Sequence, residues 1–136
     1  MPRLNVYFAM NGHSENAINF YKNCFGGQPT MMRISESPLK NNFPASMQNQ
    51  LLHAELETEG FRLMVSDMNG PDGYTTGTNM AASIDFADAE TAAQTFQKLA
   101  ENGTVLHDFQ LEFWGGMMGT LRDQFGVKWM VSVAVN

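Results

Sequence analysis

The order of apolar and polar residues predicts a strand followed by a helix at the start of the chain. Residues 3–10 alternate between apolar and polar, which is typical of a strand with one buried face. The next apolar residues recur with the spacing of one helix face; they are Ala17, Ile18, Tyr21, Cys24 and Phe25. We expect Ser14 to cap this helix at its N-terminus and Gly26 with Gly27 to end it.

The remainder of the first half reads as three strands and one long loop. A short strand is expected at residues 30–34, followed by a surface loop at 35–50 that contains two prolines and three asparagines. Residues 51–56 and 61–66 are separated by the turn 57–60, a spacing typical of a hairpin. The first half is therefore predicted to be one strand, one helix and three strands.

The same order of elements returns after a segment rich in glycine and proline. Residues 80–86 alternate again, and Asp88 is placed to cap a second helix. The apolar stripe of that helix is Ala92, Ala93, Phe96, Leu99 and Ala100. The elements expected after it are a strand at 104–108, a loop at 109–117 and a closing hairpin of 119–122 and 127–135. We divide a single domain, 1–136, into modules of about 1–68 and 79–136 with a linker at about 69–78.

A seven-residue stretch occurs twice and indicates that the two halves are copies of one module. Gly60-Phe-Arg-Leu-Met-Val-Ser66 is echoed 66 positions later by Gly126-Val-Lys-Trp-Met-Val-Ser132. Phe20 and Phe96 are 76 positions apart, and the longer loop at 35–50 accounts for the difference of ten. The helix stripes superpose better at an offset of 75, so the helical register stays open by one residue.

Composition and charge narrow the classes of partner. With 43% hydrophobic and 16% charged residues, the 136-residue chain is typical of one globular domain. A net charge of −6 argues against nucleic acid and anionic membranes as partners, because both bind basic surfaces. The single Cys24 excludes an internal disulfide, and the first residues carry no basic and apolar leader, so we expect a cytoplasmic location.

Five motifs resemble, in order and spacing, the PhnB-like branch of the vicinal-oxygen-chelate superfamily of glyoxalases, bleomycin-resistance proteins and extradiol dioxygenases. They are Ala17-Ile-Asn-Phe-Tyr21 with Phe25-Gly-Gly27, Leu52-His-Ala-Glu-Leu56, Leu63-Met-Val-Ser-Asp67, Phe113-Trp-Gly115 and Asp123-Gln-Phe-Gly-Val-Lys-Trp-Met130. The resemblance implies an α+β, glyoxalase-like fold in which two tandem βαβββ modules form a curved mixed sheet around a cleft. It also implies a homodimer, since many relatives pair.

Strand periodicity assigns residues to the helix side or to the cleft side of each sheet. If Leu63, Val65, Trp129 and Val131 back onto the helices, a mixed set of polar and apolar residues faces the cleft. That set is Arg62, Met64, Ser66, Lys128, Met130 and Ser132, with Asn5, Tyr7, Ala81, Ser83 and Asp85 from the first strands and His53, Glu55 and Glu57 from the third. Such a lining is typical of a small-molecule pocket.

The resemblance also implies where a metal would bind. Metal-dependent members place ligands, usually His and Glu, in each first strand and each last strand. Those positions fall on Met64 and Met130 and near Asn5 and Ala81. Thioethers suit Cu(I) and alanine has no donor atom, so we expect no divalent metal and no other cofactor.

His53 is the leading candidate for chemistry. Glu55 lies two residues on and on the same strand face, where it can orient the imidazole as a general base or hydrogen-bond donor. The alternative is a solvated strand histidine or one tied to a backbone carbonyl. His13 and His107 lack metal-ligand spacing and are interpreted as ordinary surface residues.

Other ligand-binding candidates each have a structural alternative. Asp67 either reaches the cleft or opens the following turn. Phe113 and Trp114 form either a lid over an apolar ligand or a plug in the core. Arg62 and Lys128 either clamp an anionic substrate or are solvated. The eleven methionines, Met64 and Met130 among them, either line a ligand surface or fill the core.

Two classes of function remain, and the sequence does not decide whether the chain is an enzyme. The preferred hypothesis is a metal-independent protein that binds a small molecule through a methionine-lined cleft with His53, Glu55, Tyr7 and Trp114. The alternative is a lyase, isomerase or dioxygenase-type enzyme that uses His53 as a base or a metal at a displaced site. A structural homodimer is a third, weaker hypothesis.

Overall fold

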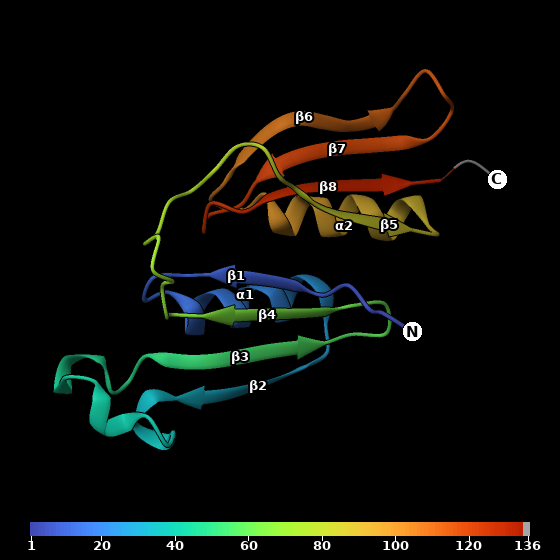
Figure 1. Ribbon diagram of the computed structural model, residues 1–136. Helices are drawn as coiled ribbons and strands as arrows, with labels where there is room; N and C mark the ends of the chain where they lie inside the picture. The colour runs from blue at the N-terminus through green and yellow to red at the C-terminus, as the bar shows by residue number, and fades with distance from the viewer. Residues whose placement is uncertain (135–136) are drawn as a thin grey trace. The chain divides into compact units, whose positions relative to one another are not determined.

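The computed structural model describes residues 1–134 and consists of two compact units, Met1–Thr75 and Thr76–Asn136. Each unit contains one helix packed against its own four-stranded mixed sheet (Figure 1). The element order in both is strand, helix and three strands, so the predicted α+β fold of two tandem βαβββ modules is confirmed. No helix among the described residues is long and apolar enough to cross a bilayer.

The first unit has the strand order β1-β4-β3-β2, with β1 and β4 parallel and the other pairs antiparallel. Its elements are β1 (Val6–Ala9), α1 (Ser14–Phe25), β2 (Gln28–Arg33), β3 (Leu51–Glu57) and β4 (Arg62–Ser66). The predicted loop at 35–50 includes three short 3-10 turns, η1 (Ile34–Glu36), η2 (Lys40–Asn42) and η3 (Ala45–Met47). The strand predicted at 30–34 begins earlier, at Gln28, because it pairs along the length of β3.

The second unit repeats this sheet in the order β5-β8-β7-β6. Its elements are β5 (Ala82–Phe86), α2 (Ala89–Leu99), β6 (Thr104–Leu111), β7 (Met117–Arg122) and β8 (Lys128–Val133). The prediction of a loop at 109–117 is wrong at both ends, because β6 continues to Leu111 and pairs there with Met117 of β7. Val135, the last residue of the predicted closing strand, lies outside the described residues.

The core of each unit lies between its helix and one face of its sheet. In the first unit the fully buried residues are Ala17, Ile18 and Tyr21 of α1 with Leu56, Leu63 and Val65 of the sheet. In the second they are Ala92 and Leu99 of α2 with Leu121, Trp129 and Val131, and Phe96 of α2 is buried with 8% exposure. Burying a side chain of this size contributes about 1.5–3 kcal/mol, so packing holds each helix in place. The predicted α2 stripe is wrong at Ala93, which is exposed, while Thr95 is buried.

The two helices begin in different ways. Asp88 caps α2 as predicted, because its side chain accepts a 2.8 Å hydrogen bond from the backbone N–H of Thr91. The prediction that Ser14 caps α1 is wrong, because Ser14 is the first helical residue and its side chain makes no capping bond. The backbone N–H of Ser14 donates instead to Oδ1 of Asp67, at 2.9 Å.

Asp67 follows β4 and ties three segments of the first unit together. Its Oδ1 accepts hydrogen bonds from the backbone N–H groups of Gly12 and Ser14, and its Oδ2 accepts one from Leu51, each at 2.9 Å. The side chain is buried, with 6% exposure. One carboxylate thus joins the turn after β1, the start of α1 and the start of β3.

The two units differ in the length of their connections. Val6 and Ala82 begin β1 and β5 and are 76 positions apart, whereas α1 and α2 begin 75 positions apart, at Ser14 and Ala89. The strand and helix offsets found in the sequence are therefore both present in the structure. The last hairpin turn has four residues (58–61) in the first unit and five (123–127) in the second. As a result β4 matches β8 at an offset of 66, but β3 matches β7 at 65.

Candidate functional site

The sheet of the first unit has a face directed away from α1, which we call the first open face. It is identified by alternation, since Leu63 and Val65 are buried while Arg62 and Met64 are partly exposed. The candidate residues on this face are Tyr7 of β1, His53, Glu55 and Glu57 of β3, and Arg62 and Met64 of β4. Three neighbouring strands therefore contribute to it.

An apolar surface and a carboxylate lie side by side on the first open face. Tyr7 is directly opposite Met64, and Met64 is directly opposite Glu55 on the next strand. Residues opposite one another in a sheet have Cβ atoms about 4.5–5.5 Å apart. Tyr7 is 54% exposed, so its ring is accessible beside the thioether.

A row of close contacts between polar and charged side chains crosses the same face. His53 Nε2 lies 3.5 Å from Glu55 Oε1, and Glu55 Oε2 lies 3.2 Å from Arg62 Nε. Arg62 Nε also donates to Glu57 Oε2 at 3.0 Å, and Glu57 Oε1 accepts from Arg3 at 3.2 Å. The structure thus brings His53, Glu55, Glu57 and Arg62 together, and it adds Arg3, which the sequence did not single out.

Arg62, in the middle of this row of contacts, already lies against two carboxylates, those of Glu55 and Glu57. Hydrogen bonds from Arg62 and then Arg3 hold the pKa of Glu57 below its usual value of 4.5. The same bond to Glu57, with the charge of Glu55, raises the pKa of Arg62. Two carboxylates next to Arg62 already balance the charge that an anionic ligand would need. The first open face is therefore better suited to a ligand with neutral polar groups than to the anion considered for Arg62.

The sheet of the second unit has a corresponding face away from α2, the second open face. Lys128 and Met130 are partly exposed there and alternate with the buried Trp129 and Val131. The row that crosses it through Met130 consists of Ser83 of β5, Met130 of β8, Thr120 of β7 and His107 of β6. Nearby, the Ser132 hydroxyl donates to Asp85 Oδ1 at 2.5 Å.

The two open faces differ in their chemistry although the strands correspond. Three matched positions carry His53, Glu55 and Glu57 on β3 and Met118, Thr120 and Arg122 on β7. The histidine and both carboxylates therefore have no counterpart in the second unit. Arg122, which the sequence did not single out, is directly opposite Lys128.

His107 is a partly exposed strand residue, and it has a partner that the sequence did not predict. Its Nε2 lies 2.5 Å from Oε1 of Glu112, whose side chain is 14% exposed. The pairing of β6 with β7 shifts register on both sides of His107, and such bulges redirect side chains. The partners are five residues apart, a spacing that strand alternation does not predict. His13 is exposed in the turn before α1.

Asp67 and the Phe113-Trp114 pair lie outside the strands that form the two open faces. The buried Asp67 carboxylate accepts three backbone hydrogen bonds, so it belongs to the framework of the first unit. Phe113 and Trp114 form an edge-to-face pair 5.0 Å apart in the turn between β6 and β7. Phe113 is 96% exposed and Trp114 49%, so neither fills the core of the second unit.

The residues at the positions implied for metal ligands do not fit a divalent ion. Met64 and Met130 occupy the last strands, and the residues directly opposite them are Tyr7 and Ser83. A pair of thioethers with a phenol and a hydroxyl lacks the imidazole and carboxylate donors that divalent metals require. Within residues 1–134, no three His, Cys, Asp or Glu side chains gather where they could hold a metal ion.

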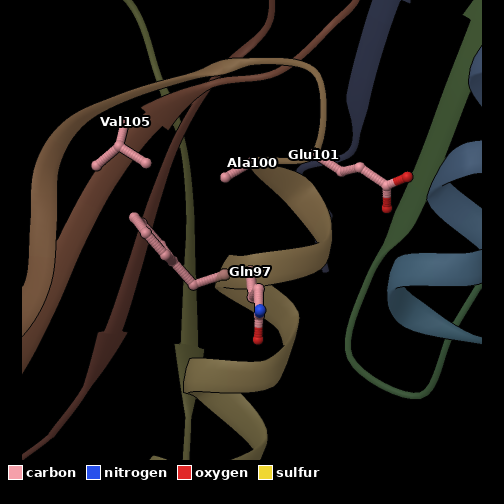
Figure 2. A pocket seen from close by; sticks show the side chains of 5 residues that line it. Gln97, Ala100, Glu101 and Val105 are labelled. Atoms are coloured by element: carbon pink, nitrogen blue, oxygen red, sulfur yellow. The ribbon is translucent and has the colours of Figure 1, made fainter.

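A separate groove of about 440 Å³ lies on the helix side of the second unit. It is lined by Phe96, Gln97, Ala100, Glu101 and Val105, from the last turns of α2 to the start of β6 (Figure 2). The carboxylate of Glu101 points away from Val105 in this view. The groove therefore offers an apolar surface but no group of polar side chains directed into it.

The chain matches known proteins over nearly its whole length. The family model described as the Glyoxalase/Bleomycin resistance protein/Dioxygenase superfamily matches residues 3–131. The chain is 30% identical to protein YjdN of Escherichia coli strain K12, over 98% of the chain and 95% of that protein. The structure of protein PA1353 from Pseudomonas aeruginosa has a TM-score of 0.84 and 29% identity, with 100% of both chains covered. A PhnB protein from Bacillus cereus has a TM-score of 0.74 and 22% identity, over 98% of this chain and 100% of that one, which shows a shared fold.

Proposed function

Since the chain belongs to the Glyoxalase/Bleomycin resistance protein/Dioxygenase superfamily, we propose that it binds a small organic molecule on the first open face without a divalent metal. The observation that carries this proposal is the chain of contacts from His53 through Glu55 to Arg62, beside Tyr7 and Met64. An apolar surface with a few fixed polar groups is the usual lining of a small-molecule site.

The contacts on this face fix the polar groups before a ligand arrives. Glu55 lies between His53 and Arg62, at 3.5 and 3.2 Å, so each side chain restricts the next. Groups held in place lose little conformational entropy on binding, which favours affinity. Asn5, which directly precedes β1, has a buried Oδ1 with no hydrogen-bond partner among residues 1–134.

A base-catalysed reaction is the second candidate, and the contact between His53 and Glu55 favours it. A carboxylate beside one ring nitrogen can orient an imidazole so that the other nitrogen accepts a proton from a ligand. His53 is 41% exposed at its side chain and is accessible for that role. The reaction is then a proton transfer in an isomerase or lyase, and no metal takes part in it.

Ligand-detected NMR with a defined panel of small phenols, amines and carboxylic acids tests the binding proposal. A compound that binds the wild type saturably should lose about tenfold in affinity in the His53→Ala variant, because a fixed polar contact is removed. His13→Ala is the matched control, since His13 is an exposed histidine in a turn. If every binder is retained equally by both variants, the first open face is not the site.

Two further measurements separate the alternatives. If His53 is a base, His53→Ala should lower kcat with little change in affinity, whereas parallel loss of affinity and function indicates binding alone. Metal analysis of the purified protein should find no stoichiometric Zn, Ni, Fe or Mn. A stoichiometric metal would contradict the metal-independent proposal.

We also propose that the protein forms a homodimer in the cytoplasm. Leu111, the last residue of β6, is 69% exposed and Phe113, two residues further on, is 96% exposed; exposed apolar residues of this size are common at interfaces. Light scattering should therefore give twice the 15.1 kDa mass of the chain. A value equal to one chain would contradict the dimer.

A further inference from the structure

Two cations face each other on the second open face. Arg122 of β7 and Lys128 of β8 are directly opposite partners in the sheet, and both are partly buried. Like charges in directly opposite positions destabilise a strand pair. The protein as a whole carries a net charge of −6, so this pair is not part of a generally basic surface.

The matched position in the first unit shows what is unusual about the pair. There β4 presents Arg62 and β3 presents Glu57 directly opposite, and the two form an ion pair at 3.0 Å. In the second unit Lys128 replaces the arginine, but Arg122 stands where the carboxylate was. The repeated module has thus exchanged an attractive pair for a repulsive one.

No carboxylate in the described part of the chain forms an ion pair with either cation. The other three arginines, Arg3, Arg33 and Arg62, each have a glutamate within 3.2 Å. Arg122 instead donates to two backbone oxygens, those of Gly126 at 2.6 Å and Gly77 at 3.2 Å. These bonds hold the guanidinium in position but leave its charge without a counterion.

Hydrogen-bonding groups surround the cation pair. Thr104 of β6 is directly opposite Arg122, and Thr120 lies two residues before Arg122 on the same face of β7. His107, held by Glu112 at 2.5 Å, is opposite Thr120. Hydroxyl groups beside an arginine and a lysine provide the donors that the oxygens of an anion require.

We propose that Arg122 and Lys128 on the second open face bind an oxyanion, either a carboxylate or a phosphate. Arginine presents a planar fork that matches two oxygens of such a group, and lysine adds a mobile point charge. The anion removes the repulsion between the two cations. The inference goes beyond the proposed function, because every contact that supports it lies within the second unit.

Titration of the ¹⁵N-labelled protein with inorganic phosphate, and separately with acetate, tests the proposal. Backbone amide signals of β7 and β8 should shift along a saturating curve with at least one anion, and sodium chloride at matched ionic strength should not reproduce it. The phosphate and acetate titrations distinguish the two kinds of oxyanion. Lys128→Gln should weaken binding by about tenfold, since it removes one of two charges.

Lys98→Gln is the matched control, because Lys98 lies in the last turn of α2. Arg122→Gln also removes backbone hydrogen bonds and can unfold the turn, so Lys128→Gln is the deciding variant. The proposal is wrong if neither anion gives saturable shifts, or if Lys128→Gln and Lys98→Gln bind equally well. If neither anion binds but a small molecule still binds in a His53-dependent way, this inference alone is wrong. If an anion binds but no small molecule binds in a His53-dependent way, the proposed function alone is wrong.

Discussion

Replacing Asp67 with asparagine or alanine probes the carboxylate that joins three segments of the first unit. The carboxylate accepts backbone hydrogen bonds from Gly12, Ser14 and Leu51, all at 2.9 Å and in a buried position. Asparagine can keep an oxygen toward the first two donors, but its NH₂ group then faces the N–H of Leu51. Alanine leaves all three donors without the carboxylate.

The loss of stability in each Asp67 variant follows from the number of backbone N–H groups that are left without a hydrogen-bond acceptor. A buried donor without its partner costs about 1–3 kcal/mol. Asp67→Asn should therefore destabilise the first unit by about 1–3 kcal/mol, and Asp67→Ala by about 3–5 kcal/mol after partial hydration of the freed groups. Because whole domains are stable by only about 5–15 kcal/mol, the alanine variant should be close to unfolding in this unit.

Urea unfolding followed separately for each unit measures the effect. Both tryptophans, Trp114 and Trp129, lie in the second unit, so fluorescence reports on that unit while amide NMR signals report on the first. A loss of about 2 kcal/mol lowers a urea midpoint by roughly 1 M. The matched control is Asp72→Asn, which changes an exposed aspartate in the loop after β4. An unchanged first-unit midpoint in Asp67→Asn, or equal midpoints for the two Asp67 variants, would refute the reasoning.

Two further substitutions test the second unit. Gly119→Ala should destabilise it by about 1–3 kcal/mol, because the added Cβ would lie 2.7 Å from the backbone of Phe109 and 2.8 Å from the ring of Phe96; an unchanged fluorescence-detected urea midpoint would contradict this. Asp88→Ala should lower the melting temperature at pH 7. Hydrogen bonds from the Thr91 hydroxyl and then from the Thr91 backbone N–H lower the pKa of Asp88 below its ordinary value of 3.8. The stabilisation that the Asp88 cap gives α2 is therefore fully present above the unfolded-state pKa of 3.8, and it is lost as the pH falls through the lower folded-state pKa. Melting curves of wild type and variant should therefore converge in acid, and a constant difference would count against the cap.

The sequence correctly predicted the elements whose structure depends on residues close to one another along the chain. The helical stripe from Ala17 to Cys24 and the Asp88 cap depend on residues within a few positions of one another, and both are present in the structure. The repeated heptad also predicted the duplication, because the alternation of Leu63 and Val65 with polar neighbours is fixed by the strand itself.

Distant contacts account for what the sequence did not predict. Ser14 was a reasonable cap by residue type, but Asp67, 53 positions away, binds its backbone N–H. Residues 109–111 were expected in a loop, yet the hairpin partner β7 extends the strand through them. In the candidate site, the contact of His53 with Glu55 followed from alternation, whereas the part played by Glu57 depends on a neighbouring strand. Arg122 was missed because its position opposite Lys128 requires the hairpin register.

The single extra residue in the turn at 123–127 has a consequence for how duplicated proteins diverge. The extra residue is accommodated within the turn, so β7 keeps the alternation of β3, with the buried Gly119 in the place of the buried Ala54. Gly119 aligns with His53 only at the heptad offset of 66, and it faces Phe96 of α2 rather than the second open face. A copy of the module can therefore change the length of a turn and still keep its buried face, so its open face diverges by substitution alone. Roles transferred from β3 to β7 at the heptad offset would be assigned to the wrong face.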